Sequence, residues 1–100
     1  MSFEVRFKDE SLDKVERDAK CSAGRGEAID KAFRKRMQQI RAAADEREFY
    51  ALKSLRFEKL KGGRSHQHSM RLNDQWRLIL EIGGEGPNKK LTVVGIEDDH

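Results

Sequence analysis

The sequence is poor in the features that crosslink, metallate or anchor small proteins. Its single cysteine, Cys21, can form no internal disulfide and has no zinc-ligand spacing around it, so we expect an ordinary thiol near a loop. The longest uninterrupted apolar runs are a few residues, whereas a helix that spans a membrane needs roughly 20. The N-terminus, MSFEVRFKDE, has no apolar signal-peptide core. We therefore predict that the chain enters no membrane and stays in the cytoplasm.

Motifs of several common enzyme classes are also missing. There is no HExxH metal-binding pattern, no glycine-rich phosphate loop followed by Lys and Ser or Thr, and no case for the lone cysteine as a nucleophile. The sequence therefore predicts neither a metal nor a cofactor. With 100 residues, of which 36% are hydrophobic and 39% charged, it predicts one domain, residues 1–100, around a single modest core.

What the sequence does contain is charge. Lys and Arg number 21 against 18 Asp and Glu, and the negative charges Glu97, Asp98 and Asp99 lie together at the C-terminus. The rest of the chain is therefore more basic than the total suggests, with cations gathered in stretches 34–41 and 56–64. The first stretch is either an RNA-binding patch or simply a solvated helix face. A polyanion would suit such a chain, and nucleic acid is the usual one.

The clearest structural pattern lies between residues 68 and 82, HSMRLNDQWRLILEI. Two alternating apolar runs flank the polar pair Asn73 and Asp74, which tolerate the backbone conformations of tight turns, so the pattern predicts a β-hairpin. Alternation places Arg71 and Arg77 on the face opposite the apolar residues. Strands would hold both cations in place, and two fixed cations favour an anion.

Other stretches predict the remaining elements. Residues 3–8 alternate like a strand with one buried face, and a short helix should follow, capped by Asp9 or Ser11. After a glycine-containing break, an apolar stripe predicts a second helix over residues 27–47, continued for about two more turns. Residues 91–96, LTVVGI, are apolar on both faces and predict a central strand.

Together these elements predict a small α+β domain. It would contain an N-terminal strand and two or three helices, which pack on one face of a curved, mainly antiparallel four-stranded sheet. The uncovered face of the sheet would then be the working surface.

Three features can supply chemistry on that surface: the basic stretch KLKGGR at 59–64, the two hairpin arginines, and the terminal EDDH at 97–100. Cleavage of RNA without a metal needs a base that takes the 2′-hydroxyl proton and an acid that protonates the leaving 5′ oxygen. It also needs cations that stabilise the charge on phosphorus. The three features contain that minimum. His66 and His68 flank the first hairpin strand at an exposed edge, where histidines are more often simple surface residues than catalysts.

One region also resembles a known family. The stretch LKGGRSHQHSMRLNDQWRLILEI, followed after a loop by LTVVGIEDDH, is similar to the second half of HigB-type toxins of the RelE/ParE superfamily. The similarity covers residues 60–100, and its most specific parts are the R(L/V)NDQWR core and the acidic ending with a histidine. It implies a RelE-like fold and a toxin of a type II toxin-antitoxin system. The HigB and RelE branches cut mRNA inside the ribosome and are neutralised by a cognate antitoxin, which in HigB systems is commonly a helix-turn-helix DNA-binding protein.

The resemblance also implies a site. The family's terminal acid falls on Asp98, its final histidine on His100 and its strand arginine on Arg71. Asp99 stands where the family usually has a tyrosine, and Glu58 stands where some HigB-like members have a histidine. We expect a catalytic set and a set that binds RNA or the ribosome. The catalytic set is Arg71, Asp98, Asp99 and His100. The set that binds RNA or the ribosome is Lys59, Lys61, Arg64, His66, His68 and Arg77.

Other interpretations remain open. Arg77 can instead be structural, paired with a carboxylate such as Glu97. The chain can instead be a ParE-like gyrase inhibitor, which shares the fold and needs no nuclease residues, although the EDDH ending argues against it. It can also be a non-catalytic module that binds RNA or a partner protein, with Asp99 marking a toxin that has lost its chemistry.

Overall fold

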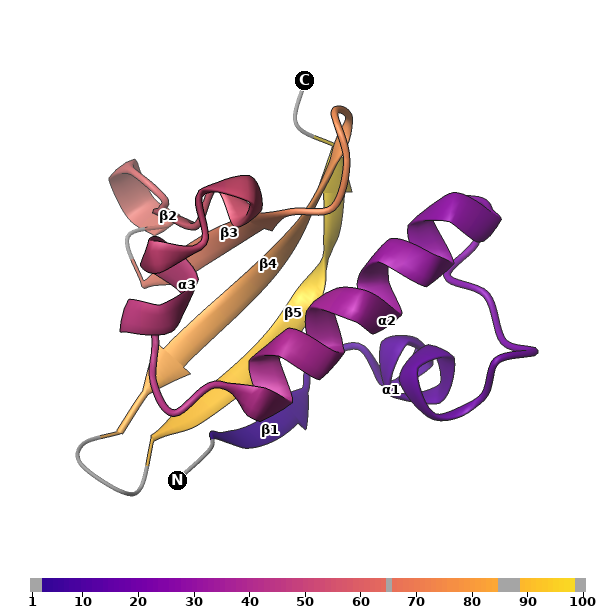
Figure 1. Ribbon diagram of the computed structural model, residues 1–100, viewed down its shortest axis with the longest axis horizontal. Coiled ribbons are helices and arrows are strands. Elements are labelled where there is room, and N and C mark those ends of the chain that lie inside the picture. Colours follow the sequence, from indigo (N-terminus) through magenta and orange to yellow (C-terminus); the bar gives the residue numbers. More distant parts are fainter. Residues whose placement is uncertain (1–2, 65, 85–88, 99–100) are drawn as a thin grey trace.

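The computed structural model describes residues 3–64, 66–84 and 89–98 of the chain. They form a five-stranded sheet packed against helices (Figure 1), which confirms the predicted α+β class. In chain order the elements are β1 (Glu4–Phe7), α1 (Glu10–Arg17), α2 (Glu27–Ala42), α3 (Arg47–Ala51), the 3-10 helix η1 (Lys53–Leu55), β2 (Glu58–Lys59), the 3-10 helix η2 (Gly62–Arg64), β3 (Gln67–Arg71), β4 (Trp76–Gly83) and β5 (Lys90–Asp98).

The strands of the sheet lie in the order β1-β5-β4-β3-β2. β1 runs parallel to β5, and the other neighbouring pairs are antiparallel. The strand predicted over residues 91–96 lies within β5, between β1 and β4. The sequence predicted four strands, and the additional one is β2. Its two residues are both exposed, so it has no apolar alternation that a sequence pattern could reveal.

β3 and β4 form the predicted antiparallel hairpin. Their register pairs Met70 with Leu78 on the core side, and both side chains are fully buried. At the turn, the side-chain oxygen of Asn73 accepts hydrogen bonds of 2.8 Å from the backbone amides of Gln75 and Trp76. Short polar side chains can mimic a backbone turn in this way, so the hairpin closes without the usual Asn-Gly pair.

Two arginines of α2 tie that helix to α1. Arg34 donates hydrogen bonds to three backbone carbonyls around the end of α1, those of Val15, Asp18 and Cys21. The last turn of a helix leaves such carbonyls without helical partners. Arg41 donates two hydrogen bonds to the Glu16 carboxylate, 2.6 and 2.7 Å long. These cations of the 34–41 stretch therefore hold the helices together, a role beyond the two that the sequence suggested.

The helix predicted from residue 27 is confirmed as far as Ala42, but its predicted continuation to residue 47 and beyond was wrong. α2 ends at Ala42, and α3 follows as a separate helix. The Asp45 side chain accepts a hydrogen bond from the backbone amide of Arg47, and Glu48 accepts one from the amide four residues before it. Hydrogen bonds from the Arg47 side chain lower the pKa of Asp45 to about 2, so this carboxylate stays charged. Such local hydrogen bonds from acidic side chains to the backbone compete with the hydrogen bonds of a continuous helix, so the chain breaks between α2 and α3.

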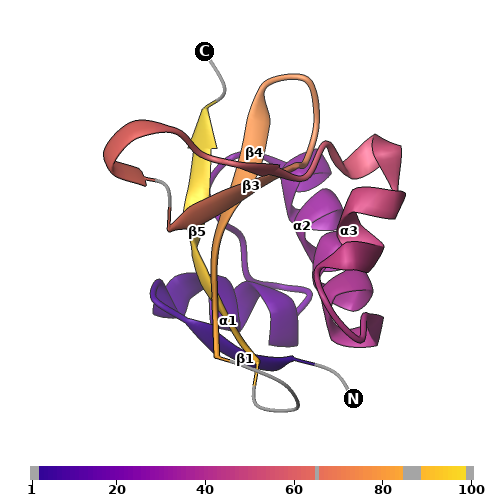
Figure 2. The same cartoon turned by 90° about the vertical axis from the view of Figure 1, so that its left-hand side faces the viewer.

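The core lies between the sheet and the helices. Figure 2 shows α2 and α3 on one side of the sheet, and their apolar side chains join those of β3, β4 and β5 in one cluster. Its largest fully buried members are Val15, Phe33, Met37, Ile40, Phe49, Leu55, Met70, Leu78, Leu80, Leu91 and Val93. We call the face of the sheet turned away from α2 and α3 the open face. In the part of the chain that the structure describes, no helix is long and apolar enough to cross a membrane.

Candidate functional site

Two arginines lie side by side on the open face. The register pairs Arg71 of β3 with Arg77 of β4, and Arg77 in turn with Glu97 of β5. The adjacent residues Met70 and Leu78 belong to the core, so alternation turns the three charged side chains to the open face. This is the placement that the hairpin pattern predicted. The three strands thus carry a row of charged groups across the sheet.

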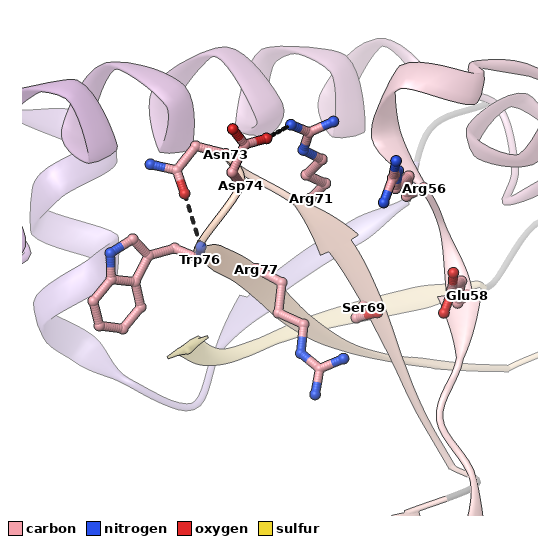
Figure 3. A pocket seen from close by; sticks show the side chains of 8 residues that line it. All are labelled: Arg56, Glu58, Ser69, Arg71, Asn73, Asp74, Trp76 and Arg77. Atoms are coloured by element: carbon pink, nitrogen blue, oxygen red, sulfur yellow. Dashed lines mark hydrogen bonds and ion pairs between the residues drawn. The ribbon is translucent and has the colours of Figure 1, made fainter. Parts of the chain in front are cut away.

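A small cavity of about 120 Å³ opens beside this row, and Figure 3 shows the side chains that line it. They come from the hairpin, its turn and the segment around the start of β2: Arg56, Glu58, Ser69, Arg71, Asn73, Asp74, Trp76 and Arg77. Three of these residues are arginines, whose planar guanidinium groups match the geometry of phosphate oxygens. We call this cavity the arginine pocket.

Arg71 is held at both its backbone and its side chain. The Arg36 side chain on α2 donates a 2.8 Å hydrogen bond to the backbone carbonyl of Arg71. Burial, and then the charge of Arg71, lower the pKa of Arg36 from its ordinary value. The Arg71 side chain forms an ion pair with Asp74 in the hairpin turn, and the Asp74 side chain is 94% exposed. A ligand anion can therefore reach Arg71 and compete with Asp74 for it.

Glu58 brings a carboxylate to the same pocket. It pairs in register with Ser69 of β3, which is 4% exposed. Ser69 and Arg71 alternate onto the same face, so Glu58 lies on the open face as well. Glu58 is absent from the site residues predicted above. The available signal was its position, where some HigB-like members have a histidine, because both side chains can accept a proton.

Arg64 reaches across the open face from η2 to β5. Its guanidinium donates two hydrogen bonds of 2.9 and 2.6 Å to the Glu97 carboxylate, and one of 3.0 Å to Gln67 on β3. β4 lies between β3 and β5, so Arg64 passes over β4, where Ile79 on the same face is fully buried. The hydrogen bonds from Arg64, with attraction to Arg64 and Arg77, lower the pKa of Glu97. Part of the open face next to the pocket is therefore covered by an ion pair.

The two histidines lie apart from the arginine pocket. His68 faces the helices and stacks on Phe57, with ring centroids 5.0 Å apart and planes at 5°. Burial, and then the charge of Lys59, lower the pKa of His68. Lys59 pairs in register with His68 and so shares its face. The exposed His66 lies 3.7 Å from the Glu81 carboxylate, measured from its Nε2 atom.

The C-terminal members of the predicted catalytic set are described only in part. Asp98 is the last residue of β5 and accepts a 3.3 Å hydrogen bond from the side chain of Gln75. It follows Glu97 along the strand, so the alternation of β5 turns it to the opposite face from Glu97. Asp99 and His100 lie outside the described residues.

The predicted site residues thus fall into two groups. Arg71 and Arg77 meet at the pocket, and Arg64 is linked to their row through Glu97. Outside the pocket lie Lys59, Lys61, His66, His68 and Asp98. Among the residues described, no group of three or more His, Cys, Asp or Glu could hold a metal ion. The pocket can therefore bind an anion through its arginines and offer it the Glu58 carboxylate as a proton acceptor.

The fold has a counterpart among solved structures. It is similar to a solved structure, a YoeB/ParE toxin from Agrobacterium tumefaciens, with a TM-score of 0.65 over 98% of this chain and 100% of that one. The two sequences are 15% identical, so this likeness shows a shared fold alone. A comparison with curated proteins gives no significant match.

A family model then identifies the family. The model of HigB-like toxins, described as the RelE-like toxin of the type II toxin-antitoxin system HigB, matches residues 5–92. The chain therefore belongs to the HigB-like toxins, which confirms the resemblance, and membership of a type II family implies an antitoxin partner. The matched region contains Glu58, Arg71 and Arg77 and ends before residues 93–100.

Proposed function

We propose that this toxin inhibits translation by cutting mRNA in the ribosome, without a metal ion. The observation that carries the proposal is the arginine pocket, where Arg71 and Arg77 lie side by side and Glu58 lies on the same face. Figure 3 shows the two side chains extending in different directions, so the pocket offers two guanidinium groups to an RNA strand, and a phosphate bound there would bring RNA next to a carboxylate. Membership of the RelE-like toxins adds support, since these toxins are generally endoribonucleases.

The reaction follows from the roles of these groups. Glu58 takes the proton of the 2′-hydroxyl, whose oxygen then attacks the adjacent phosphorus. The bond from phosphorus to the 5′ oxygen breaks, and that oxygen takes a proton from an acid, which leaves a 2′,3′-cyclic phosphate and a 5′-hydroxyl. Arg71 and Arg77 stabilise the negative charge that builds on the phosphate oxygens.

We assign the acid to His100. Its imidazole has a reference pKa of about 6.5 and so can give a proton near neutral pH.

The ribosome supplies the placement of the RNA strand that the pocket lacks. The pocket is small, and among its lining residues Trp76 is the single aromatic one. A protein that binds single-stranded RNA alone usually stacks successive bases on several aromatic rings. The substrate is therefore mRNA already held in a ribosome, in the cytoplasm. We also propose that the antitoxin is a helix-turn-helix DNA-binding protein, as is common in HigB systems.

Mapping of mRNA ends in a translation extract tests this function. Cuts in phase with codons that appear only when ribosomes are present would support the nuclease. DNA damage without RNA cuts would support a gyrase inhibitor instead. If neither RNA cuts nor DNA damage appear, the protein is the non-catalytic binder. Purified protein on naked RNA at physiological salt is the matched control, and efficient cutting there would refute the dependence on ribosomes.

A further inference from the structure

Arg56 has an unusual backbone conformation. Among the described residues other than glycine, it alone has a positive φ, with φ 46° and ψ 49°. L-amino acids with long side chains rarely adopt this left-handed region, which favours glycine and, after it, asparagine. Residues held in sparsely populated conformations often cluster at functional sites, so this arginine calls for an explanation beyond chain folding.

Two buried neighbours hold the conformation in place. Leu55 is fully buried and Phe57 is 6% exposed, and the backbone amide of Arg56 donates a 3.1 Å hydrogen bond to the carbonyl of Lys53, the first residue of η1. The ring of Phe57 is itself packed against the rings of Phe49, Tyr50 and His68. The backbone of Arg56 is thus fixed between two anchors, while its side chain is exposed and lines the arginine pocket (Figure 3).

Arg56 also differs from Arg64 and Arg71 in how its charge is balanced. Arg71 is paired with Asp74, and Arg64 is paired with Glu97. In the described part of the chain, no carboxylate forms an ion pair with Arg56. A guanidinium that is held at a pocket wall and left without a counter-charge is prepared for an anion from outside.

We propose that Arg56 binds the RNA phosphate next to the one that is cut. This inference rests on the proposed function and deepens it. Arg71 and Arg77 form one row on the hairpin, and Figure 3 shows Arg56 on a different segment, the one that also carries Glu58. A strand whose scissile phosphate lies on the hairpin row would meet Arg56 with a neighbouring phosphate. That second contact fixes the strand so that its 2′-hydroxyl faces Glu58, which makes Arg56 a positioning residue.

The substitution Arg56→Asn tests this role without disturbing the backbone. Asparagine tolerates the left-handed region, so the thermal midpoint should equal or exceed that of wild type. The matched control is Lys53→Gln, which removes the same charge from η1 outside the pocket. On ribosomes that hold mRNA, we expect Arg56→Asn to lower the cleavage efficiency about 10-fold or more, as for lost hydrogen bonds to a charged group. Lys53→Gln should cleave like wild type.

A binding measurement separates failure of this inference from failure of the proposed function. The probe is an mRNA with its 2′-hydroxyls methylated, held on ribosomes, which the toxin can bind but not cut. The slope of log affinity against log salt should become shallower by about 0.7 in Arg56→Asn, the value for one lost phosphate contact on a single strand, and should not change in Lys53→Gln. A wild-type protein that cuts no mRNA refutes the proposed function, while the slope still tests Arg56. Equal slopes in both variants, or a lower thermal midpoint in Arg56→Asn, would overturn the assignment.

Discussion

Asp74 forms an ion pair with Arg71 across the turn between β3 and β4. The Arg71 side chain is 35% exposed and that of Asp74 is 94% exposed, so water screens the pair. Exposed pairs of this kind contribute about 0.2–1 kcal/mol. Asp74 thus occupies, at little energetic advantage, the position beside Arg71 where the proposed function requires a phosphate.

The first prediction follows from this competition. Replacing Asp74 with Asn should raise the affinity of the toxin for mRNA on ribosomes by up to about fivefold, because Arg71 no longer has to lose a counter-charge. The measurement is the protein concentration that gives half-maximal cleavage. Asp13→Asn is the matched control, since Asp13 also forms an exposed ion pair with an arginine, Arg17 on α1. If the two variants have the same affinity, Asp74 does not compete with RNA.

Glu58 should be essential for the rate of cutting and dispensable for the fold. As a general base it should contribute about 100- to 10,000-fold, so Glu58→Gln should lose that factor in single-turnover cleavage. Its exposed position on β2 predicts an unchanged thermal midpoint. Glu58→His is the informative partner variant, because imidazole can also accept a proton and should restore part of the rate. Full activity in Glu58→Gln would remove Glu58 from the mechanism.

The ion pair between Arg64 and Glu97 should make stability depend on pH in acid. The pKa of Glu97 is lowered in the folded chain, chiefly by hydrogen bonds from Arg64. In an unfolded chain the pKa of a glutamate is about 4.3. The pair therefore stabilises the fold above that pH, and its contribution is lost as pH falls through the lowered value. Both side chains are partly exposed, so we expect a loss of only about 0.5 kcal/mol.

Denaturant unfolding of wild type and Glu97→Gln, from neutral pH to about pH 3, measures this contribution. The difference in free energy of unfolding between the two proteins should shrink as the solution becomes acid. A difference that stays constant over the whole range would show that Glu97 contributes no charge-dependent stability.

The sequence predicted the arginine row because the hairpin has a strict period of two. Once Met70 and Leu78 are assigned to the core, Arg71 and Arg77 can only face the other way. β2 carries no such signal, because its two exposed residues become a strand only through pairing with β3. Glu58 was therefore missed together with the strand that positions it.

Sequence patterns also could not predict contacts between distant parts of the chain. Arg36 lies in a charged stretch, and nothing in that stretch shows that its side chain bonds to the backbone of Arg71, 35 residues away. The left-handed conformation of Arg56 was equally unpredictable, since the usual signal for it is glycine or asparagine. Both features depend on how the helices, η1 and the hairpin pack together, and that packing is a property of the whole fold.

Arg71→Ala is the most direct test of the arginine pocket as the cleavage site. The variant removes the guanidinium but keeps the backbone carbonyl that accepts the hydrogen bond from Arg36, so the fold should be retained. The measurement is the rate of mRNA cutting on ribosomes, with thermal midpoint and antitoxin binding as checks that both proteins are folded. We predict a rate loss of about 100-fold or more with both checks near wild type. Cutting at the wild-type rate by folded Arg71→Ala protein would contradict the account.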